Sequence, residues 1–366
     1  MATEFFAEVR TLALSEPFRI AHGASSSRDV LRVRIGEAWG EAPFVPYDQE
    51  QPEEVVRWLE AWRDSAGARA RFERAAGAVA AAAGRTGFDW RTLADGLPEA
   101  APRVARLALC SVLADAVGKA AGRPFWELLG LAPGTAPPAC RSVGIPGDLG
   151  AYRDQVERLA RHFPVIKLKL GSGDLAFDRE MVAAARAAAP RATLFADANC
   201  GWSPKEAAAI IPSLPDWGIA FVEQPVGRDD SLEPWRELRA RLPRCPLPLV
   251  ADESAQTAAD VPRLRGLADG VNVKLVKAGG LDLAHTMIVA AHEAGMSVLL
   301  GCMIESSLGV TAAAQLAPLA DFIDLDGHLY LARDDWSGLT FDPAGRLVLP
   351  DRPGLGCVPR AQRPSP

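Results

Sequence analysis

The sequence predicts an α/β protein in which a smaller α+β domain, formed by the N-terminal part of the chain, precedes a parallel β/α barrel. Two observations support this fold class. Short apolar runs separated by helix-like stretches recur between residues 138 and 330, and a segment that is first alternating and then helical precedes them. A length of 366 residues suits one barrel of about 200 to 250 residues plus a second unit.

The N-terminal region alternates between apolar and polar residues at period two in FFAEVRTLAL and DVLRVRIGEAWGEA. This pattern predicts antiparallel strands, and the segment FRIAHGASSSR between them is expected to be a loop that acts as a lid. From about residue 51 the chain is rich in Ala, Arg, Leu and Glu, which is typical of helices. We therefore assign residues 1–130 to an α+β capping domain.

Eight buried runs follow, and each except the last leads into a helix-like stretch. They are RSVGI, FPVIKLKL, ATLFADAN, GIAFVEQP, LPLVADES, GVNVKLVKAGG, MSVLLGCMIESS and ADFIDLDG. Such an order predicts a parallel barrel of the (β/α)₇β or (β/α)₈ kind, and we adopt the former, a modified TIM barrel, for residues 131–340. Residues 341–366 are expected to return to the capping domain and complete it.

Composition excludes several classes of protein. The net charge is −6 and the predicted isoelectric point is about 5.5, without the basic tract of a nucleic-acid-binding protein. The N-terminus MATEFFAEVR is acidic, and no stretch approaches the roughly 18 apolar residues that span a bilayer. We expect a cytoplasmic protein with neither a nucleic-acid nor a membrane partner. Six cysteines with no CxxC pair and no close histidine argue against a zinc site or a disulfide framework.

Lysine is rare in this chain and concentrated at the ends of two runs. Only six of the forty basic residues are lysines, and four of them lie in VIKLKLG and VNVKLVKAGG. An amine can lose its proton when it is desolvated or crowded by another cation, whereas a guanidinium cannot. The alternative is a strand whose alternate lysines face water. Three acidic motifs between the two clusters, FADANCGW, FVEQP and LVADES, favour a catalytic role instead.

Those motifs place Asp197, Glu223 and Asp252 at the ends of three consecutive strands. The ends of parallel strands meet at one face of a barrel, so the three carboxylates are expected to be neighbours that need a cation between them. All-oxygen ligation favours Mg²⁺ first and Mn²⁺ second. Asn199 and Glu253 are expected to orient these ligands. The alternative is that the three acids are unrelated and cap the helices that follow.

Two lysines flank the carboxylates on opposite walls of the predicted barrel, Lys169 on the second strand and Lys274 on the sixth. One could remove a proton from the α-carbon of a carboxylate substrate to give an enediolate, and the other could return a proton to the opposite face. Lys167 lies on the same side of its strand as Lys169. Its positive charge is expected to favour the neutral amine of Lys169.

Taken in order, KxK, DAN, VEQP, ADES and VKLVKAGG resemble the enolase superfamily, in its muconate-lactonizing subgroup and, within that, the dipeptide epimerases. The handling of protons by a lysine beside magnesium is a known pattern of this superfamily. The resemblance covers nearly the whole chain. It implies that Lys169 and Lys274 are the acid/base pair, that Lys167 is an electrostatic neighbour and substrate contact, and that Asp197, Glu223 and Asp252 bind magnesium. A homo-oligomer is common in the family and is an open alternative here.

The eighth run distinguishes between members of the subgroup. Asp324 and Asp326 in DLDG resemble the DxD motif with which dipeptide epimerases bind the α-ammonium group of the substrate, and an acidic pair at period two suits such a cation. The resemblance also implies that Ser142, Cys302 and Ile304 line the dipeptide, with a position in the core as the alternative for Ile304. A solvated acid pair that caps a turn is the alternative for Asp324 and Asp326.

The resemblance implies an isomerase that inverts the α-carbon of the C-terminal residue of a dipeptide by a two-base 1,1-proton transfer. One departure concerns Gly23, which stands where some Ala-Glu epimerases carry an arginine. We therefore expect a small or hydrophobic C-terminal residue, with Arg19, His22 or Arg28 as alternative charges for an acidic one. The first rival is an o-succinylbenzoate synthase, muconate cycloisomerase or N-acylamino-acid racemase of the same superfamily. The second is a non-catalytic barrel that binds small carboxylates.

Overall fold

A parallel eight-stranded barrel lies at the centre of the fold. The computed structural model describes residues 4–45, 50–82, 90–98 and 100–361. The barrel strands are β4 (Cys140–Val143), β5 (Val165–Lys169), β6 (Thr193–Asp197), β7 (Ile219–Glu223), β8 (Leu249–Ala251), β9 (Gly270–Lys274), β10 (Ser297–Gly301) and β11 (Phe322–Asp324). Each strand pairs with its neighbours in chain order, and a parallel bridge between Ala139 and Ile323 joins the two ends of the sheet. The predicted fold class, (β/α)₇β, is confirmed.

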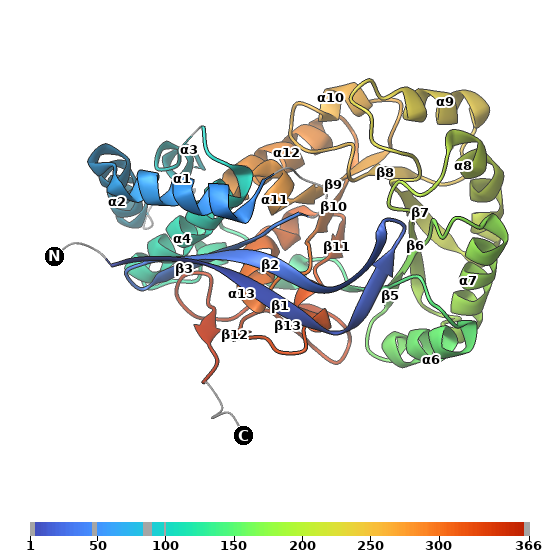
Figure 1. Cartoon of the computed structure of the whole chain (residues 1–366), viewed down its shortest axis with the longest axis horizontal. Coiled ribbons are helices and arrows are strands. Elements are labelled where there is room, and N and C mark those ends of the chain that lie inside the picture. The colour runs from blue at the N-terminus through green and yellow to red at the C-terminus, as the bar shows by residue number, and fades with distance from the viewer. Residues whose placement is uncertain (1–3, 46–49, 83–89, 99, 362–366) are drawn as a thin grey trace.

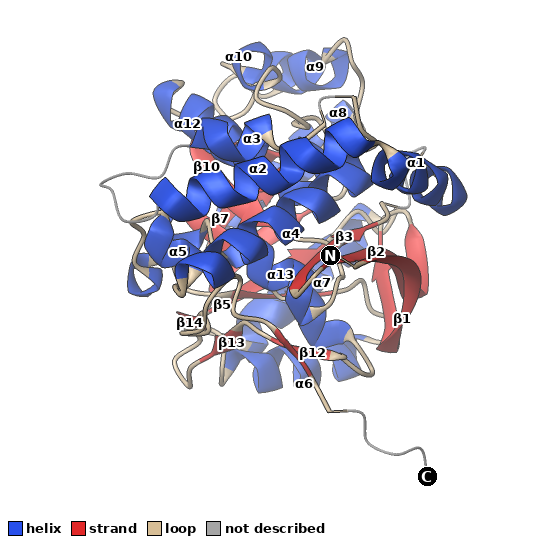
Figure 2. Ribbon diagram, turned by 90° about the vertical axis from the view of Figure 1, so that its left-hand side faces the viewer, coloured by secondary structure: helices blue, strands red, loops and turns tan. Residues whose placement is uncertain are grey.

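An α-helix or pair of α-helices follows every barrel strand except β11. These are α6 (Leu149–Ala160), α7 (Leu175–Ala188), α8 (Pro204–Ile210), α9 (Glu233–Arg241), α10 (Val261–Leu264), α11 (Leu275–Ala278), α12 (Leu281–Glu293) and α13 (Ser307–Ala314). The first residues of several of these helices are fixed by nearby side chains. Asp148 and Asp174 accept backbone N–H groups at the start of α6 and α7, and Ser203 and Glu206 form a capping box before α8. Figure 2 shows the helices packed around the strands.

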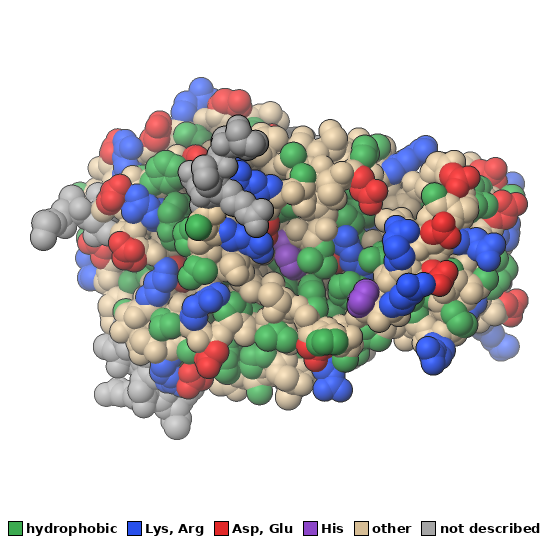
Figure 3. Space-filling model, turned by 90° about the horizontal axis from the view of Figure 1, so that it is seen from below, with side chains coloured by type: hydrophobic (Ala, Val, Ile, Leu, Met, Phe, Trp, Pro, Cys, Tyr) green, Lys and Arg blue, Asp and Glu red, His purple; other side chains and the backbone are tan. Residues whose placement is uncertain are grey.

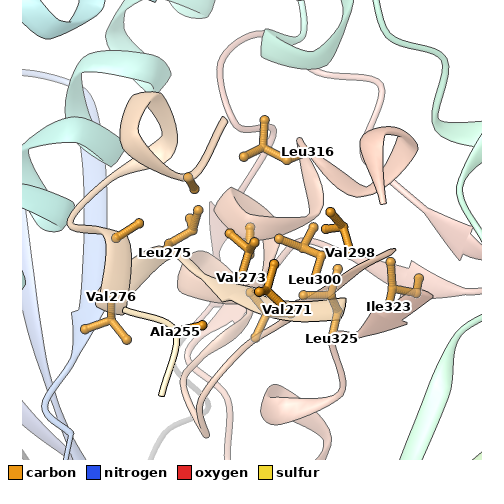
Figure 4. Close-up of a cluster of buried hydrophobic side chains, with 14 of the residues drawn as sticks. Ala255, Val271, Val273, Leu275, Val276, Val298, Leu300, Leu316, Ile323 and Leu325 are labelled. Carbon is orange, nitrogen blue, oxygen red and sulfur yellow. The ribbon is translucent and has the colours of Figure 1, made fainter. Parts of the chain in front are cut away.

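The main core lies between the barrel wall and its helices. Alternation at period two sends Val271 and Val273 of β9 outward into this core, together with Val298 and Leu300 of β10 (Figure 4). The residues between them on each strand therefore face the interior of the barrel. This outward apolar row fixes the register that aims the polar side chains of the strands inward.

The capping domain combines an antiparallel sheet with a group of helices. The sheet has the order β1 (Phe5–Ile20), β2 (Gly23–Ile35) and β3 (Ala38–Pro43). The helices are α1 (Pro52–Asp64), α2 (Ala66–Ala82), α3 (Trp90–Asp95), α4 (Arg103–Ala121) and α5 (Phe125–Leu128). Helix α4 is buried along most of its length, and β3 packs so closely on it that a side chain at Gly40 would strike the backbone of Ala108.

The expected lid loop over residues 18–28 is wrong, because the strands continue through it. β1 ends at Ile20 and β2 begins at Gly23, whose φ of 123° allows the chain to reverse within two residues. The pairing of the two strands shifts register between Ala13 and Phe18. There β1 contacts the segment after β11, and the N–H of Ala332 donates to Ala13 O at 2.9 Å. Figure 1 shows the resulting hairpin extending from the cap to the barrel strands.

Buried hydrogen bonds and one buried ion pair join the cap to the barrel. Arg32 of β2 donates to Glu41 of β3 at 2.8 Å, and the same carboxylate accepts the N–H and the hydroxyl of Ser306, each at 2.7 Å, just before α13. Arg106 of α4 binds both carboxylate oxygens of Asp282 in α12, at 3.0 and 2.7 Å. Bidentate arginine pairs of this kind fix orientation as well as distance.

The chain after β11 forms two short two-stranded sheets and contacts both the barrel and the cap. It contains β12 (Trp336–Ser337), β13 (Thr340–Phe341), β14 (Leu347–Val348) and β15 (Val358–Pro359), paired as β12 with β15 and β13 with β14. Gly345 O accepts the N–H of Ala139 at 2.9 Å, and the N–H of Leu355 donates to Asp115 of α4 at 2.9 Å. The division of the chain at residues 130 and 340 remains our proposal for the domain boundaries.

The surface is polar and mixed in sign. On the face in Figure 3, acidic and basic side chains are interspersed, with apolar side chains near the middle. None of the helices in the described part of the chain is long and apolar enough to cross a membrane.

Candidate active site

The interior of the barrel has an apolar layer below a charged one. The apolar layer consists of Cys140, Val165, Phe195, Phe221, Val250 and Leu299. The rings of Phe195 and Phe221 lie 4.2 Å apart between centroids. Two residues further along four of these strands the side chains are Lys167, Asp197, Glu223 and Asp252. The apolar layer therefore closes the barrel on one side of the charged groups and leaves them facing the C-terminal mouth.

The three predicted metal ligands lie side by side. Asp197 and Glu223 are direct partners in the register of β6 and β7, and Asp252 immediately follows β8. All three are fully buried. Lys167 connects this group to the eighth strand, because its Nζ lies 3.0 Å from Asp197, 2.7 Å from Glu223 and 2.7 Å from Asp324.

Lys169 and Lys274 stand at the two ends of a series of five adjacent strands, with the three carboxylates on the strands between them. Lys169 Nζ lies 2.6 Å from Asp197 Oδ2, and Lys274 Nζ lies 2.8 Å from Asp252 Oδ2. Their side chains are 12% and 10% exposed, whereas that of Lys167 is 1% exposed. Only the two flanking lysines therefore reach the cavity above the carboxylates.

Two further residues of this group had no role in the sequence prediction. Lys277 is buried, and its Nζ donates to the Asp252 side chain at 2.6 Å and to the backbone oxygens of Asp252 and Asn272 at 2.7 Å. Asn272 points into the barrel and donates to Glu223 at 2.7 Å, in space that a side chain at Gly301 would fill. The rarity of lysine was a usable signal for Lys277, whereas an asparagine inside an apolar strand gave a weaker one.

Burial and crowding shift the pKa values in this group. Burial, reinforced by Asp197, raises the pKa of Glu223 to about 7. Burial, reinforced by Asp252, raises the pKa of Glu253 to about 8. Burial also opposes ionisation of Asp197, yet Lys167 and Lys169 lower its pKa to about 2. For Lys167 the surrounding carboxylates outweigh burial and raise its pKa well above the usual range, so this amine stays a cation.

The group fits a hard divalent cation. Its donors are carboxylate oxygens, which Mg²⁺ and Mn²⁺ prefer. Among the described residues, the buried oxygens Asn199 Oδ1 and Glu253 Oε2 have no hydrogen-bond partner, and Asn199 Nδ2 holds Glu253 Oε1 at 3.3 Å. Buried acceptors without donors, next to a carboxylate whose ionised form is disfavoured, indicate that a positive charge is needed here.

A cavity of about 610 Å³, including its open mouth, lies above the charged layer. It brings together nine of the predicted residues: Ser142, Lys169, Asn199, Glu253, Lys274, Cys302, Ile304, Asp324 and Asp326. It also contains Arg28 of the β1–β2 hairpin, which the sequence offered as an alternative charge for an acidic C-terminal residue. Phe18 and Ile20 of the hairpin also line it, as do Met303, Gly327 and Tyr330, and these five were not among the predicted site residues. The hairpin therefore supplies part of the wall.

The acidic pair of the eighth strand is embedded in a hydrogen-bond network. Asp326 Oδ2 accepts from Arg141 at 3.0 Å, from the N–H of Ser142 at 2.7 Å and from the hydroxyl of Tyr330 at 2.8 Å. Ser142 Oγ donates to Asp324 at 3.1 Å. The guanidinium of Arg141 lies over the Tyr330 ring, 3.8 Å from its centroid. Asp326 thus already has a cationic partner, and both carboxylates line the cavity.

Several known proteins that are similar to this chain are epimerases. Residues 151–363 match the family described as Enolase C-terminal domain-like. An L-Ala-D/L-amino acid epimerase of Maribacter sp. is 36% identical over 66% of this chain and 68% of its own length. A hydrophobic dipeptide epimerase of Roseobacter litoralis is 38% identical over 69% of this chain and 72% of its own. The solved dipeptide epimerase from Methylococcus capsulatus, complexed with Mg and L-Arg-D-Lys, is 29% identical with a TM-score of 0.80, covering 97% of this chain and 99% of that one.

Proposed function

The chain belongs to the enolase superfamily, among its dipeptide epimerases, and on this basis we propose that it inverts the α-carbon of the C-terminal residue of a dipeptide by a two-base proton transfer that depends on Mg²⁺. The observation that carries this proposal is the placement of Lys169 and Lys274. Each lines the cavity, and the carboxylates of β6, β7 and the segment after β8 lie between them. A pair of bases that flank a bound carbon is what inversion at that carbon requires.

Asp197, Glu223 and Asp252 would hold the magnesium ion, with Asn199 and Glu253 orienting these ligands. A bound Mg²⁺ supplies Lewis-acid stabilisation of the negative charge that develops on the substrate carboxylate. Mn²⁺ prefers the same oxygen donors and is the alternative ion. Lys167 is held as a cation by three carboxylates and contributes positive charge below the substrate without exchanging protons.

The two lysines would divide the proton transfer between them. One acts as a neutral amine and takes the α-proton, while the other is an ammonium and donates a proton to the opposite face. For the other epimer the roles are exchanged. Their limited exposure, 12% and 10% of the side chains, keeps bulk water from competing for the deprotonated carbon.

The substrate would be bound at both of its ends. Asp324 and Asp326 face the cavity and suit the α-ammonium group of a dipeptide. Phe18, Ile20 and Ile304 give the cavity an apolar wall. This wall supports the expectation of a small or hydrophobic C-terminal residue. Arg28 lines the same cavity and stays the alternative charge for an acidic one. An o-succinylbenzoate or N-acylamino-acid substrate has no ammonium group for the acidic pair to bind.

The test is proton exchange in D₂O. We expect L,L-dipeptides with hydrophobic C-terminal residues to gain deuterium at that residue's α-carbon and to convert to L,D-dipeptides, as followed by NMR and mass spectrometry. Lys169→Arg and Lys274→Arg should each lower the rate of inversion by about 10³-fold or more, since a positioned acid or base contributes roughly 10²- to 10⁴-fold. Lys205→Arg, at an exposed position on α8, is the matched control. Inversion at the original rate in either active-site variant would refute the assigned roles.

A further inference from the structure

A second group of metal-binding side chains lies beside the carboxylate site, with three different donor types. His22, Cys200 and Glu253 each offer one ligand atom, and these three atoms lie within 4.8 Å of one another. His22 comes from the turn of the β1–β2 hairpin, Cys200 from the segment after β6, and Glu253 from the segment after β8. Neither His22 nor Cys200 has a part in the proposed proton transfer.

Cys200 is fixed by its backbone, and Glu253 is buried. Cys200 has a φ of 65°, and its N–H donates to Gln224 O at 2.9 Å. Glu253 is 4% exposed, and among the described residues its Oε2 has no hydrogen-bond partner. A buried carboxylate oxygen without a donor is costly, and a cation would satisfy it.

The hairpin turn is docked where His22 can reach this group. Ala21 packs against Gly171 and Gly201, where added Cβ atoms would lie 3.2 and 3.0 Å from its own Cβ. The two glycines therefore allow the turn to approach the barrel closely. His22, the next residue, is exposed to solvent on one side and close to Cys200 and Glu253 on the other.

We propose that His22, Cys200 and Glu253 form a zinc site that fastens the hairpin to the barrel mouth. A thiolate, an imidazole and a carboxylate are the donors of zinc sites, with water as the fourth ligand, whereas the neighbouring site offers only oxygens. Zinc bonds of about 2.0 to 2.3 Å place the ligand atoms of a tetrahedron roughly 3.3 to 3.8 Å apart. The observed separations, up to 4.8 Å, need only a small approach of each side chain. Binding forms the Zn–S bond and releases the thiol proton to solvent.

Occupancy of this site would slow turnover, a consequence that rests on the proposed function. The hairpin supplies Phe18 and Ile20 to the cavity wall, and Glu253 lines the same cavity. A metal ion bound to both His22 and Glu253 would therefore link the hairpin to the segment after β8. A substrate that must pass the hairpin would then exchange more slowly.

Cobalt spectroscopy tests the site without depending on catalysis. With saturating Mg²⁺ present, Co²⁺ added to the full chain should give a thiolate-to-cobalt charge-transfer band in the near ultraviolet. The band should saturate at one equivalent of Co²⁺ per chain. Added Zn²⁺ should displace the cobalt and abolish the band. We expect Cys200→Ser to abolish the band and His22→Ala to weaken cobalt binding at least tenfold. Cys245→Ser and His162→Ala, which alter a cysteine and a histidine outside the group, should leave both unchanged. Absence of the band, or its survival in Cys200→Ser, would overturn the zinc site.

Inhibition kinetics test the consequence separately. At saturating Mg²⁺ the original chain should lose dipeptide inversion as Zn²⁺ is added, and a chelator should restore it. Cys200→Ser should retain the rate measured without zinc and need at least tenfold more Zn²⁺ for half inhibition. Equal sensitivity of both proteins would show that zinc acts at the oxygen ligands and would refute the fastening of the hairpin. If no inversion occurs at all, the proposed function fails, while the cobalt band still decides the site.

Discussion

The barrel mouth and the β1–β2 hairpin form the same cavity but are built in different ways. The mouth takes its charged residues from the ends of neighbouring strands, and most of them are buried among ion pairs. The hairpin contributes the apolar Phe18 and Ile20 together with Arg28, and His22 in its turn is exposed. The comparison indicates that the chemistry is set by the regular barrel, whereas access and side-chain preference depend on a separate unit docked onto it.

The two regions also differ in what holds them. Removing a charge from the mouth leaves a buried partner without compensation, which is expensive. The hairpin is held by close backbone contacts such as that between Gly144 and Arg19, where the N–H of Ile145 donates to Arg19 O at 2.9 Å. Changes in the mouth should therefore act on stability and rate, and changes at the hairpin contacts should act mainly on substrate affinity.

The largest expected effect on stability is that of Lys277→Met. It removes the cation that contacts the Asp252 side chain at 2.6 Å and two backbone oxygens at 2.7 Å, within a fully buried group. Breaking one side of a buried ion pair typically costs about 3 to 5 kcal/mol. We expect the free energy of unfolding, measured in urea with EDTA, to fall by that amount. It should fall less in saturating Mg²⁺, because the ion would compensate the charge of Asp252.

Lys205→Met is the control for this substitution, because Lys205 is exposed and lies away from the barrel interior. It should change the free energy of unfolding by about 0.5 kcal/mol or less. A Lys277→Met protein as stable in EDTA as this control would show that the mouth does not rely on its buried charge balance.

An intermediate effect is expected where the hairpin meets the barrel. A Cβ atom at Gly144 would lie 2.9 Å from Arg19 O and 3.4 Å from the Phe18 ring, so Gly144→Ala should displace the hairpin. Overpacking of this kind costs about 1 to 3 kcal/mol. We expect a several-fold increase in KM for a hydrophobic dipeptide with a smaller change in kcat. Gly147→Ala, in the same segment with nothing within 4 Å of the added atom, should leave both constants unchanged. If kcat fell by a larger factor than KM rose, the hairpin would take part in the chemical step and not only in substrate binding.

The difference between the regions also explains what the sequence could predict. Asp197, Glu223 and Asp252 follow buried apolar runs at regular intervals, and period two then aims each side chain into the barrel, so local pattern was enough. The hairpin could not be read in this way. Its register shift and its turn depend on contacts with Ala332 and with the glycines after β5 and β6, which are distant in the sequence.

The same limit applies to residues that act through distant partners. Arg141 approaches Asp326 only because the barrel closes between its first and last strands. Cysteine spacing argued against a zinc site, since Cys200 has no nearby histidine in the sequence. The fold nevertheless places His22 beside it. Spacing rules detect sites made within one segment, so they would not detect the zinc site that we propose between the two regions.

The smallest expected effect is at Tyr330, where the two regions touch. Its hydroxyl lies 2.7 Å from Ser142 O and 2.8 Å from Asp326 Oδ2, two acceptors that share its single hydrogen, and its ring centroid lies 4.6 Å from that of Phe18 in the hairpin. Tyr330→Phe keeps the ring and removes the hydroxyl, at a cost of about 1 kcal/mol. Because Asp326 keeps Arg141 and Ser142 as donors, we expect KM to rise about fivefold or less, with kcat nearly unchanged. Tyr152→Phe is the control, since the buried Tyr152 hydroxyl has no hydrogen-bond partner among the described residues and its removal should not destabilise the protein. If the two variants behave alike, the hydroxyl of Tyr330 does not position Asp326, and the contact between hairpin and eighth strand is one of ring packing alone.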